Sequence, residues 1–141
     1  MQRTLKNFKK KLLSSFKPVK TNNYGINDRR CLRFLTQLRV DLNPLRFYKF
    51  ACKFPDTSNE LCLCGFGAED IYHYLLHCHV FHDIRNTLLI NVSGIVGEDA
   101  RLYSDITLKN LLLYGDENFS YVANKSILKE TLTFIHQSER F

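Results

Sequence analysis

Soft metal ligands are concentrated in residues 61–85, which hold three of the five cysteines and four of the five histidines. Thiolate sulfur and imidazole nitrogen are the ligands that structural zinc sites use, usually four around one ion. Crowding within about two dozen residues is uncommon by composition alone. We interpret Cys62, Cys64, His73 and Cys78 as the ligands of one structural zinc ion, Zn2+.

The histidine ligand has alternatives in this pattern. His77 and His79 flank Cys78, and either could replace His73 or form a weaker second site. Neighbouring helical positions point in different directions, so we expect most of these histidines to lie at the surface or beside the site. A redox pair of Cys62 and Cys64 is disfavoured, because one intervening residue strains a disulfide.

Four protein ligands would leave no position for a substrate water, so the predicted site stabilises the fold and performs no chemistry. The sequence lacks the His-x-Glu pattern of zinc deaminases and the His-Glu-x-x-His pattern of metalloproteases. After Asp83 it shows no catalytic constellation. We therefore expect neither an enzyme nor a small-molecule substrate, with a small metal- or thiol-dependent enzyme as the alternative.

A tight turn and a helix must position the four ligands. Gly65 follows the two cysteines directly and supplies the backbone freedom that a knuckle requires. Glu69 and Asp70 are acids suited to the first turn of a helix that carries His73. His73 and Cys78 can reach one ion only if this helix loosens near Cys78.

The rest of the chain predicts an all-α fold of about six helices clamped by the zinc knuckle. Residues 1–27 are expected to form a basic amphipathic helix and a linker, and residues 28–141 a helical zinc-binding domain, within a single domain overall. Besides the helix that carries His73, apolar periodicity and capping residues place helices at 4–16, 28–42, 45–53, 80–92, 104–113 and 120–137.

Several interior positions follow from this pattern. Asp28 is expected to cap the helix at 28–42, and an apolar stripe should bury Cys31, Leu35, Leu38 and Leu42. Further residues expected in the interior include Phe47, Phe50, Cys52, Val80, Leu108, Leu111, Leu112, Ile127, Leu128, Thr131 and Ile135.

Positive charge is concentrated in the first third of the chain. Residues 1–53 hold 14 of the 20 lysines and arginines against two acids, a net charge of +12, whereas residues 54–141 carry a net charge of −6. Such asymmetry is typical of a protein that meets a polyanion on one side, although a solvated basic face is the simpler alternative. Candidate nucleic-acid contacts are Arg29, Arg30, Arg33, Arg39, Arg46, Lys49 and Lys53, the last three interleaved with aromatic residues.

Composition also bears on location. No apolar run approaches the ~20 residues that a membrane span needs, so we expect no membrane association. An odd number of cysteines alternating with histidines favours an intracellular reducing compartment, nuclear or cytoplasmic. A mitochondrial transit peptide is the alternative for the basic N-terminal segment.

Several motifs in order resemble the C-terminal region of non-LTR, LINE-type or jockey-like retrotransposon polyproteins. These are Leu-Thr-Gln-Leu-Arg-Val at 35–40, Asn-Pro-Leu at 43–45, Tyr-Lys-Phe at 48–50, and Leu-Cys-Leu-Cys-Gly at 61–65, followed by Glu69, His73 and Cys78 and by Arg-Phe at 140–141. The resemblance spans about residues 33–141. The chain departs from it at His79, where the family usually has proline, and it contains no Tyr-x-Asp-Asp polymerase motif.

The resemblance implies a zinc module that holds template RNA or target DNA beside a reverse transcriptase. Carried over, the ligands are Cys62, Cys64, His73 and Cys78. The predicted function is therefore a zinc-stabilised nucleic-acid-binding module, with RNA or DNA as partner and a reverse transcriptase core as a further candidate partner. The alternative is a degenerate retrotransposon-derived fragment that acts as a structural or protein-interaction domain.

Overall fold

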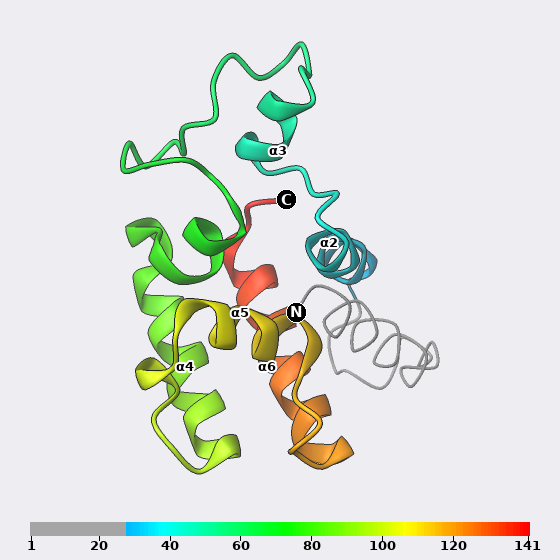
Figure 1. Cartoon of the computed structure of the whole chain (residues 1–141), viewed down its shortest axis with the longest axis vertical. Helices are drawn as coiled ribbons and strands as arrows, with labels where there is room; N and C mark the ends of the chain where they lie inside the picture. Colours follow the sequence, from blue (N-terminus) through cyan, green and yellow to red (C-terminus); the bar gives the residue numbers. More distant parts are fainter. Residues whose placement is uncertain (1–27) are drawn as a thin grey trace.

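A computed structural model describes residues 28–141 of the chain. This part is helical and contains no strand, which confirms the all-α prediction for it. In Figure 1, α4, α5 and α6 form the lower half of the molecule, and α3 with the loop after it stands above them. The elements in order are α2 (Arg29–Arg39), α3 (Arg46–Ala51), η2 (His73–His77), η3 (His79–Phe81), α4 (His82–Val96), η4 (Ala100–Leu102), α5 (Asp105–Tyr114) and α6 (Tyr121–Ser138).

The helix and linker predicted within residues 1–27, and the question of a transit peptide, lie outside the described residues. In the part that is described, no helix combines the length and the apolar character needed to cross a membrane.

Helix α2 begins as predicted, because the Asp28 side chain accepts a hydrogen bond from the backbone N–H of Arg30 at 2.8 Å. It buries Cys31, Leu35 and Leu38, together with Phe34. The prediction was wrong at Leu42, which is 57% exposed. The helix ends at Arg39 and the backbone of Asp41 has a φ of 60°, so the apolar stripe does not extend to Leu42.

Helix α3 corrects three further predictions, because Phe47, Phe50 and Cys52 are all exposed instead of buried. The helix is only six residues long and buries none of its own residues. Leu45, immediately before it, is fully buried and anchors the segment in the core. The aromatic side of α3 therefore faces solvent.

The lower half is a small bundle in which α4 packs against α6 and α6 against α5. Ser104 and Ser120 cap α5 and α6, and Gly97 and Gly115 follow the last residues of α4 and α5, each with a positive φ. Helix α4 begins two residues later than predicted, after a short 3-10 turn, which leaves Val80 exposed. The other interior predictions are confirmed: Leu108, Leu111, Leu112, Ile127, Leu128, Thr131 and Ile135 are buried.

Tyr74 lies at the centre of the core and is fully buried. Phe34, Phe81, Phe134 and Phe141 surround its ring, each in an edge-on arrangement with centroids 5.5–5.7 Å away. The Tyr74 hydroxyl lies 2.7 Å from the Ser138 hydroxyl. This aromatic cluster joins α2, α6 and the C-terminal end of the chain. Its central residue, Tyr74, directly follows His73 in the sequence.

Candidate metal centre

Cys62 and Cys64 lie in a short loop that an isolated antiparallel bridge between Leu61 and Ala68 closes. Within the loop, the Cys62 N–H donates to the Gly67 carbonyl at 2.8 Å, and the Gly65 N–H donates to the Cys62 carbonyl at 3.0 Å. Gly65 has a φ of 82° and Gly67 a φ of 116°, positive values that other residues rarely adopt. The predicted knuckle is therefore present.

His73 and Cys78 are brought to the same side by a π-helical turn. In an α-helix, residues five apart point about 140° away from each other. Here the Cys78 N–H donates to the His73 carbonyl at 2.7 Å, the five-residue bond of a π-turn, and Cys78 then leaves the helix with φ −60° and ψ 120°. The helix thus loosens before Cys78, as its shared site with His73 requires.

The structure brings the four predicted ligands together. Their sulfur and nitrogen atoms all lie within 4.8 Å of one another, so the cluster could hold a metal ion. The Cys62 and Cys78 sulfurs are 4.0 Å apart, and the Cys64 sulfur lies 3.2 Å from His73 Nε2. All the cysteines are free thiols, and three of the four cluster residues are buried, with Cys64 half-buried.

The two alternative histidines lie outside this cluster. His77 is exposed, and its Nε2 lies 2.7 Å from a carboxylate oxygen of Asp105 on α5. His79 is also exposed and meets the ring of Phe66 edge-on, with centroids 4.9 Å apart. In this conformation neither can share an ion with the three cysteines.

Burial shapes the acid–base chemistry of the cluster. It lowers the pKa of His73, which favours the neutral imidazole that a metal ligand must be. Burial also raises the pKa of Cys62 to about 12. Without a cation, the Cys62 thiol therefore stays protonated, and a metal ion must displace that proton to bind.

Arg85 on α4 is a residue of the site that the sequence reasoning missed. Its side chain is buried, and it donates from Nε to the Leu75 carbonyl at 2.8 Å and from Nη2 to the Cys78 carbonyl at 2.7 Å. These bonds hold the end of the π-turn and bring a positive charge beside Cys78. The sequence does contain a sign of this role, because Arg85 lies on the same face of α4 as the buried residues Leu88, Leu89 and Val92.

Glu69 was predicted to lie in the first turn of a helix, but it is a buried anchor beside the knuckle, 2% exposed. Arg140 donates to both of its carboxylate oxygens, at 2.6 and 2.7 Å, and the Arg46 N–H donates at 2.8 Å. Asp70 plays the helix-capping role instead, accepting from the His73 N–H at 2.7 Å. Glu69 thus joins α3, the knuckle and the C-terminal end.

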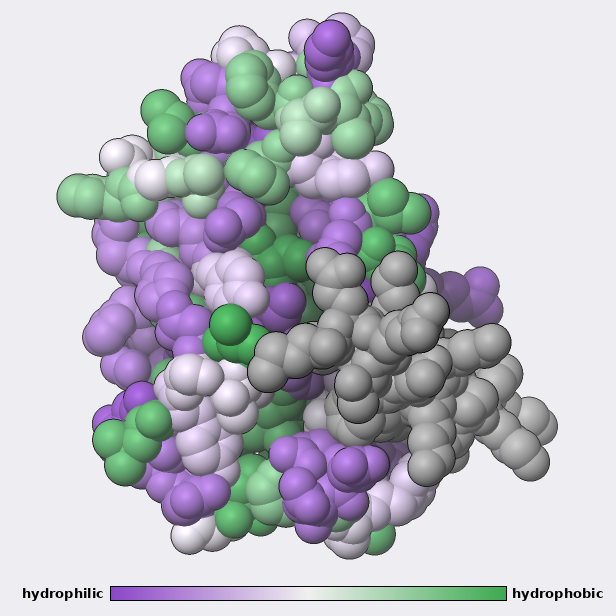
Figure 2. Space-filling model, viewed as in Figure 1, coloured by the Kyte–Doolittle hydropathy of each residue, from purple (hydrophilic) through white to green (hydrophobic). Residues whose placement is uncertain are grey.

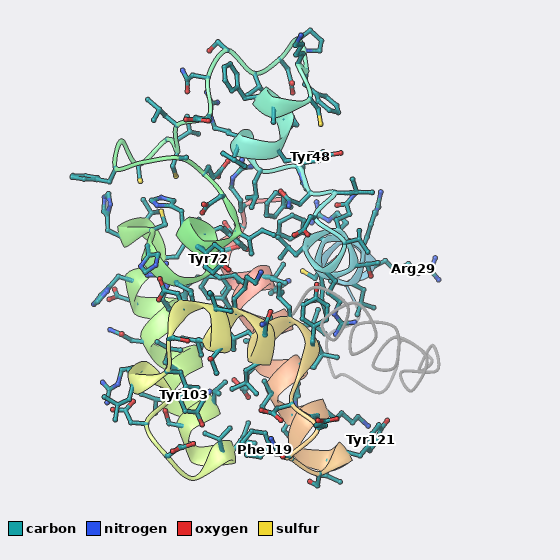
Figure 3. The ribbon with its side chains drawn as sticks, in the orientation of Figure 1. Arg29, Tyr48, Tyr72, Tyr103, Phe119 and Tyr121 are labelled. Carbon is teal, nitrogen blue, oxygen red and sulfur yellow. The ribbon has the colours of Figure 1, made fainter. Side chains whose placement is uncertain are left out.

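The seven candidate nucleic-acid contacts divide into two groups. Arg29, Arg30, Arg33 and Lys53 are exposed, and Figure 3 shows Arg29 extending away from the body of the molecule. Of these four, Arg30 also has its Nε 3.9 Å from a carboxylate oxygen of Asp28. The other three side chains make hydrogen bonds within the protein: Arg39 to the Leu113 carbonyl, Arg46 to Asn59 and Lys49 to Asp56.

Comparison with known proteins gives no relative. No protein-family model matches the chain, and no curated protein or solved structure is significantly similar to it.

Proposed function

We propose that the chain is a zinc-stabilised module that binds single-stranded nucleic acid. Zinc binding is supported by one observation: the imidazole of His73 and the thiols of Cys62, Cys64 and Cys78 lie close together around one point. A tetrahedral zinc ion with bonds of about 2.3 Å to sulfur and about 2.0 Å to nitrogen separates two sulfurs by about 3.8 Å and sulfur from nitrogen by about 3.5 Å. The Cys62 and Cys78 sulfurs, 4.0 Å apart, are slightly farther apart than the first value. The Cys64 sulfur and His73 Nε2, 3.2 Å apart, are slightly closer than the second.

Four protein ligands close the coordination sphere, so the proposed ion has a structural role. It fixes a loop and a π-turn that have little other regular structure. Metal analysis of the purified chain tests this, with one zinc per chain expected. Cys62→Ser and His73→Ala should lose it together with helical circular dichroism, whereas His79→Ala, which removes an exposed histidine beside Cys78, should keep it. Zinc retained in His73→Ala and lost in His79→Ala would contradict the assignment.

The nucleic-acid part rests on exposed cations of α2 and on exposed aromatic rings beside a lysine in α3 and the loop after it. Arg33 follows Arg30 and Arg29 by three and four residues, and all three arginines are exposed on α2. Phe50, Lys53 and Phe54 line a hollow on α3 and the loop after it. Hydrophobic side chains reach the surface in this upper part of the molecule (Figure 2). Cations that contact phosphates beside rings that stack on bases are the combination used to bind single strands.

Salt dependence tests this proposal with a labelled single-stranded RNA or DNA oligonucleotide. Changing Arg29, Arg30 and Arg33 to Gln should weaken binding and make the slope of log affinity against log salt shallower by about 2, at about 0.7 per phosphate contact. The matched control changes Arg101, Lys125 and Lys129 to Gln, which removes the same charge from the acidic part. Equal effects of both triple variants, or binding independent of salt, would contradict a contact surface on α2.

A second test separates stacking from charge. Phe50→Ala should weaken single-strand binding by about 1–3 kcal/mol for each base that the ring stacks, without changing the salt slope. Phe119→Ala, at a partly buried ring in the segment between α5 and α6, is the control for loss of an aromatic residue elsewhere.

The alternative is a structural or protein-interaction role, and one observation favours it. Residues 28–141 carry 13 lysines and arginines against all 14 acids, a net charge of −1, so this part of the chain has no excess of positive charge. The resemblance to non-LTR retrotransposon polyproteins supports the nucleic-acid proposal through the motifs at 35–78. Undetectable binding of RNA and DNA by the zinc-loaded chain would favour the alternative.

A further inference from the structure

A second group of metal-ligating side chains lies where the beginning of α2 meets the end of α6. Asp28 caps α2, Cys31 lies one turn further along it, and His136 is in the last turn of α6. They line a hollow of about 230 Å3 that Glu139 and Phe141 also border. This group shares no residue with the zinc cluster.

The three donor atoms converge on one point. Cys31 Sγ lies 3.4 Å from Asp28 Oδ2 and 4.0 Å from His136 Nδ1, and His136 Nδ1 lies 3.4 Å from Asp28 Oδ2. Around a tetrahedral zinc ion, sulfur, nitrogen and oxygen ligands are about 3.3–3.6 Å apart. The two distances to Asp28 Oδ2, both 3.4 Å, match these values, and the Cys31–His136 distance of 4.0 Å is longer than them.

The surroundings direct these atoms toward one another. Both contacts from Arg30, its backbone N–H at 2.8 Å and its Nε at 3.9 Å, use Oδ1 of Asp28. The other oxygen, Oδ2, is the one that faces Cys31 and His136. Cys31 is 6% exposed, so its thiol is held within the seam and cannot turn away into solvent.

We propose that Asp28, Cys31 and His136 form a second, weaker site for a borderline divalent ion such as Zn2+ or Co2+. One thiolate, one imidazole and one carboxylate make a mixed ligand set that suits such ions. Three protein ligands leave a position open for water or for Glu139, in contrast to the closed zinc cluster. An ion here joins α2 to α6 and binds or leaves without exposing the core.

Cobalt titration of the full chain tests the site, because the thiolate–cobalt absorption reports ligation directly. The wild type should bind two equivalents, the second more weakly. His136→Ala should weaken the second by at least about tenfold, the cost typical of losing even an outer partner of a metal ligand. Asp28→Asn, which retains a capping side chain, should also weaken it. His82→Ala, at an exposed histidine of α4, should leave both equivalents unchanged.

The titration distinguishes the second site from the zinc cluster. Cys31→Ser should remove the second equivalent and keep the first, since Cys31 is not among the four ligands of the zinc cluster. A wild type that takes up a single equivalent, or a second equivalent that survives in His136→Ala, would overturn the second site. His136 is exposed, so His136→Ala should keep the circular dichroism of the wild type, and its titration then measures the site and not the fold.

Discussion

Arg85 shows how a single side chain can support the candidate metal centre without being one of its four predicted ligands. It is buried among apolar residues, its described hydrogen bonds go to two backbone carbonyls, and burial lowers its pKa. Three thiolates and one imidazole around Zn2+ carry a net charge of −1. With such an ion bound, the guanidinium beside Cys78 would offset that charge, so we expect the metal and the arginine to stabilise each other.

Replacing Arg85 should therefore weaken both fold and metal binding. Arg85→Leu removes a donor from the Leu75 carbonyl and one of two donors from the Cys78 carbonyl, which keeps the Phe81 N–H at 3.2 Å. A buried group that loses its hydrogen bond costs about 1–3 kcal/mol. We expect a free energy of unfolding lower by at least about 2 kcal/mol and faster zinc loss to a chelator. Arg101→Leu, at an exposed arginine paired with Asp99, is the control. A variant that retains zinc as firmly as the wild type would contradict this role.

Thiol reactivity should differ among the five cysteines. Cys52 is exposed, whereas burial and then the hydrogen bond to Asp28 raise the pKa of Cys31 to about 11. The reactive thiolate of Cys31 is therefore scarce below about pH 9 and grows only as the pH approaches 11. With one equivalent of zinc bound, mass spectrometry should show iodoacetamide on Cys52 first and Cys31 slowly. A chelator should then expose three more thiols.

At the scale of elements, the C-terminal end after α6 acts as a tie across the molecule. Arg140 pairs with buried Glu69, and Phe141 lies against Phe34 and Tyr74. The tie thus connects the knuckle, α2 and the core. Its hydrogen bond to Glu69 raises the pKa of Arg140, which keeps this cation charged.

Breaking one half of this pair should cost more than replacing both. Arg140→Met leaves a buried carboxylate without its partner and should lower the free energy of unfolding by about 3 kcal/mol or more. Combining it with Glu69→Leu should recover part of that loss, since no unpaired charge is then buried. Denaturant unfolding of both single variants and the double variant measures this coupling. Additive losses would contradict it.

Much of the helical framework could be predicted because its signals are local. Asp28, Ser104 and Ser120 are capping residues placed just before apolar periodicity, and each caps its helix through a side-chain hydrogen bond. Exposure at Phe47 and Phe50 could not be predicted, because it depends on which distant element covers a face. Within residues 28–141, no element covers that face of α3, and Phe47 and Phe50 are exposed.

The candidate site could be predicted by residue type but not by geometry. The spacing of the cysteines and the glycines near them indicate a knuckle. Spacing alone, however, leaves His73, His77 and His79 all as candidates for the histidine ligand. The π-turn distinguishes them, because its five-residue bond turns His73 toward Cys78. A π-turn has no strong composition signal. The same holds for Arg85 and Arg140, whose partners are set by tertiary packing.

For the whole molecule, charge is divided between two parts of the chain. Residues 1–27 hold seven lysines and arginines and no acid, a net charge of +7, whereas residues 28–141 have a net charge of −1. If the chain binds a polyanion, we expect the charges of the N-terminal segment to contribute together with those of α2. Counterion release scales with the number of phosphates that are neutralised, so each part should contribute a separable share of the salt dependence.

Changing Lys9, Lys10 and Lys11 to Gln in the full chain should make the salt slope of oligonucleotide binding shallower by about 2. Zinc content and the melting temperature should remain those of the wild type. Combined with the α2 variant, the two effects should add. An unchanged slope would show that the N-terminal charges do not meet the nucleic acid.

The knuckle also has a consequence for the order in which the chain folds. Its outermost ligands, Cys62 and Cys78, are 16 residues apart, whereas the Glu69–Arg140 pair spans 71 residues and the Cys31–His136 contact 105. Closing a short loop costs less chain entropy than closing a long one. We expect the metal-bound knuckle to form early and the seam between α2 and α6 to close last, so zinc should accelerate refolding while variants in that seam chiefly accelerate unfolding.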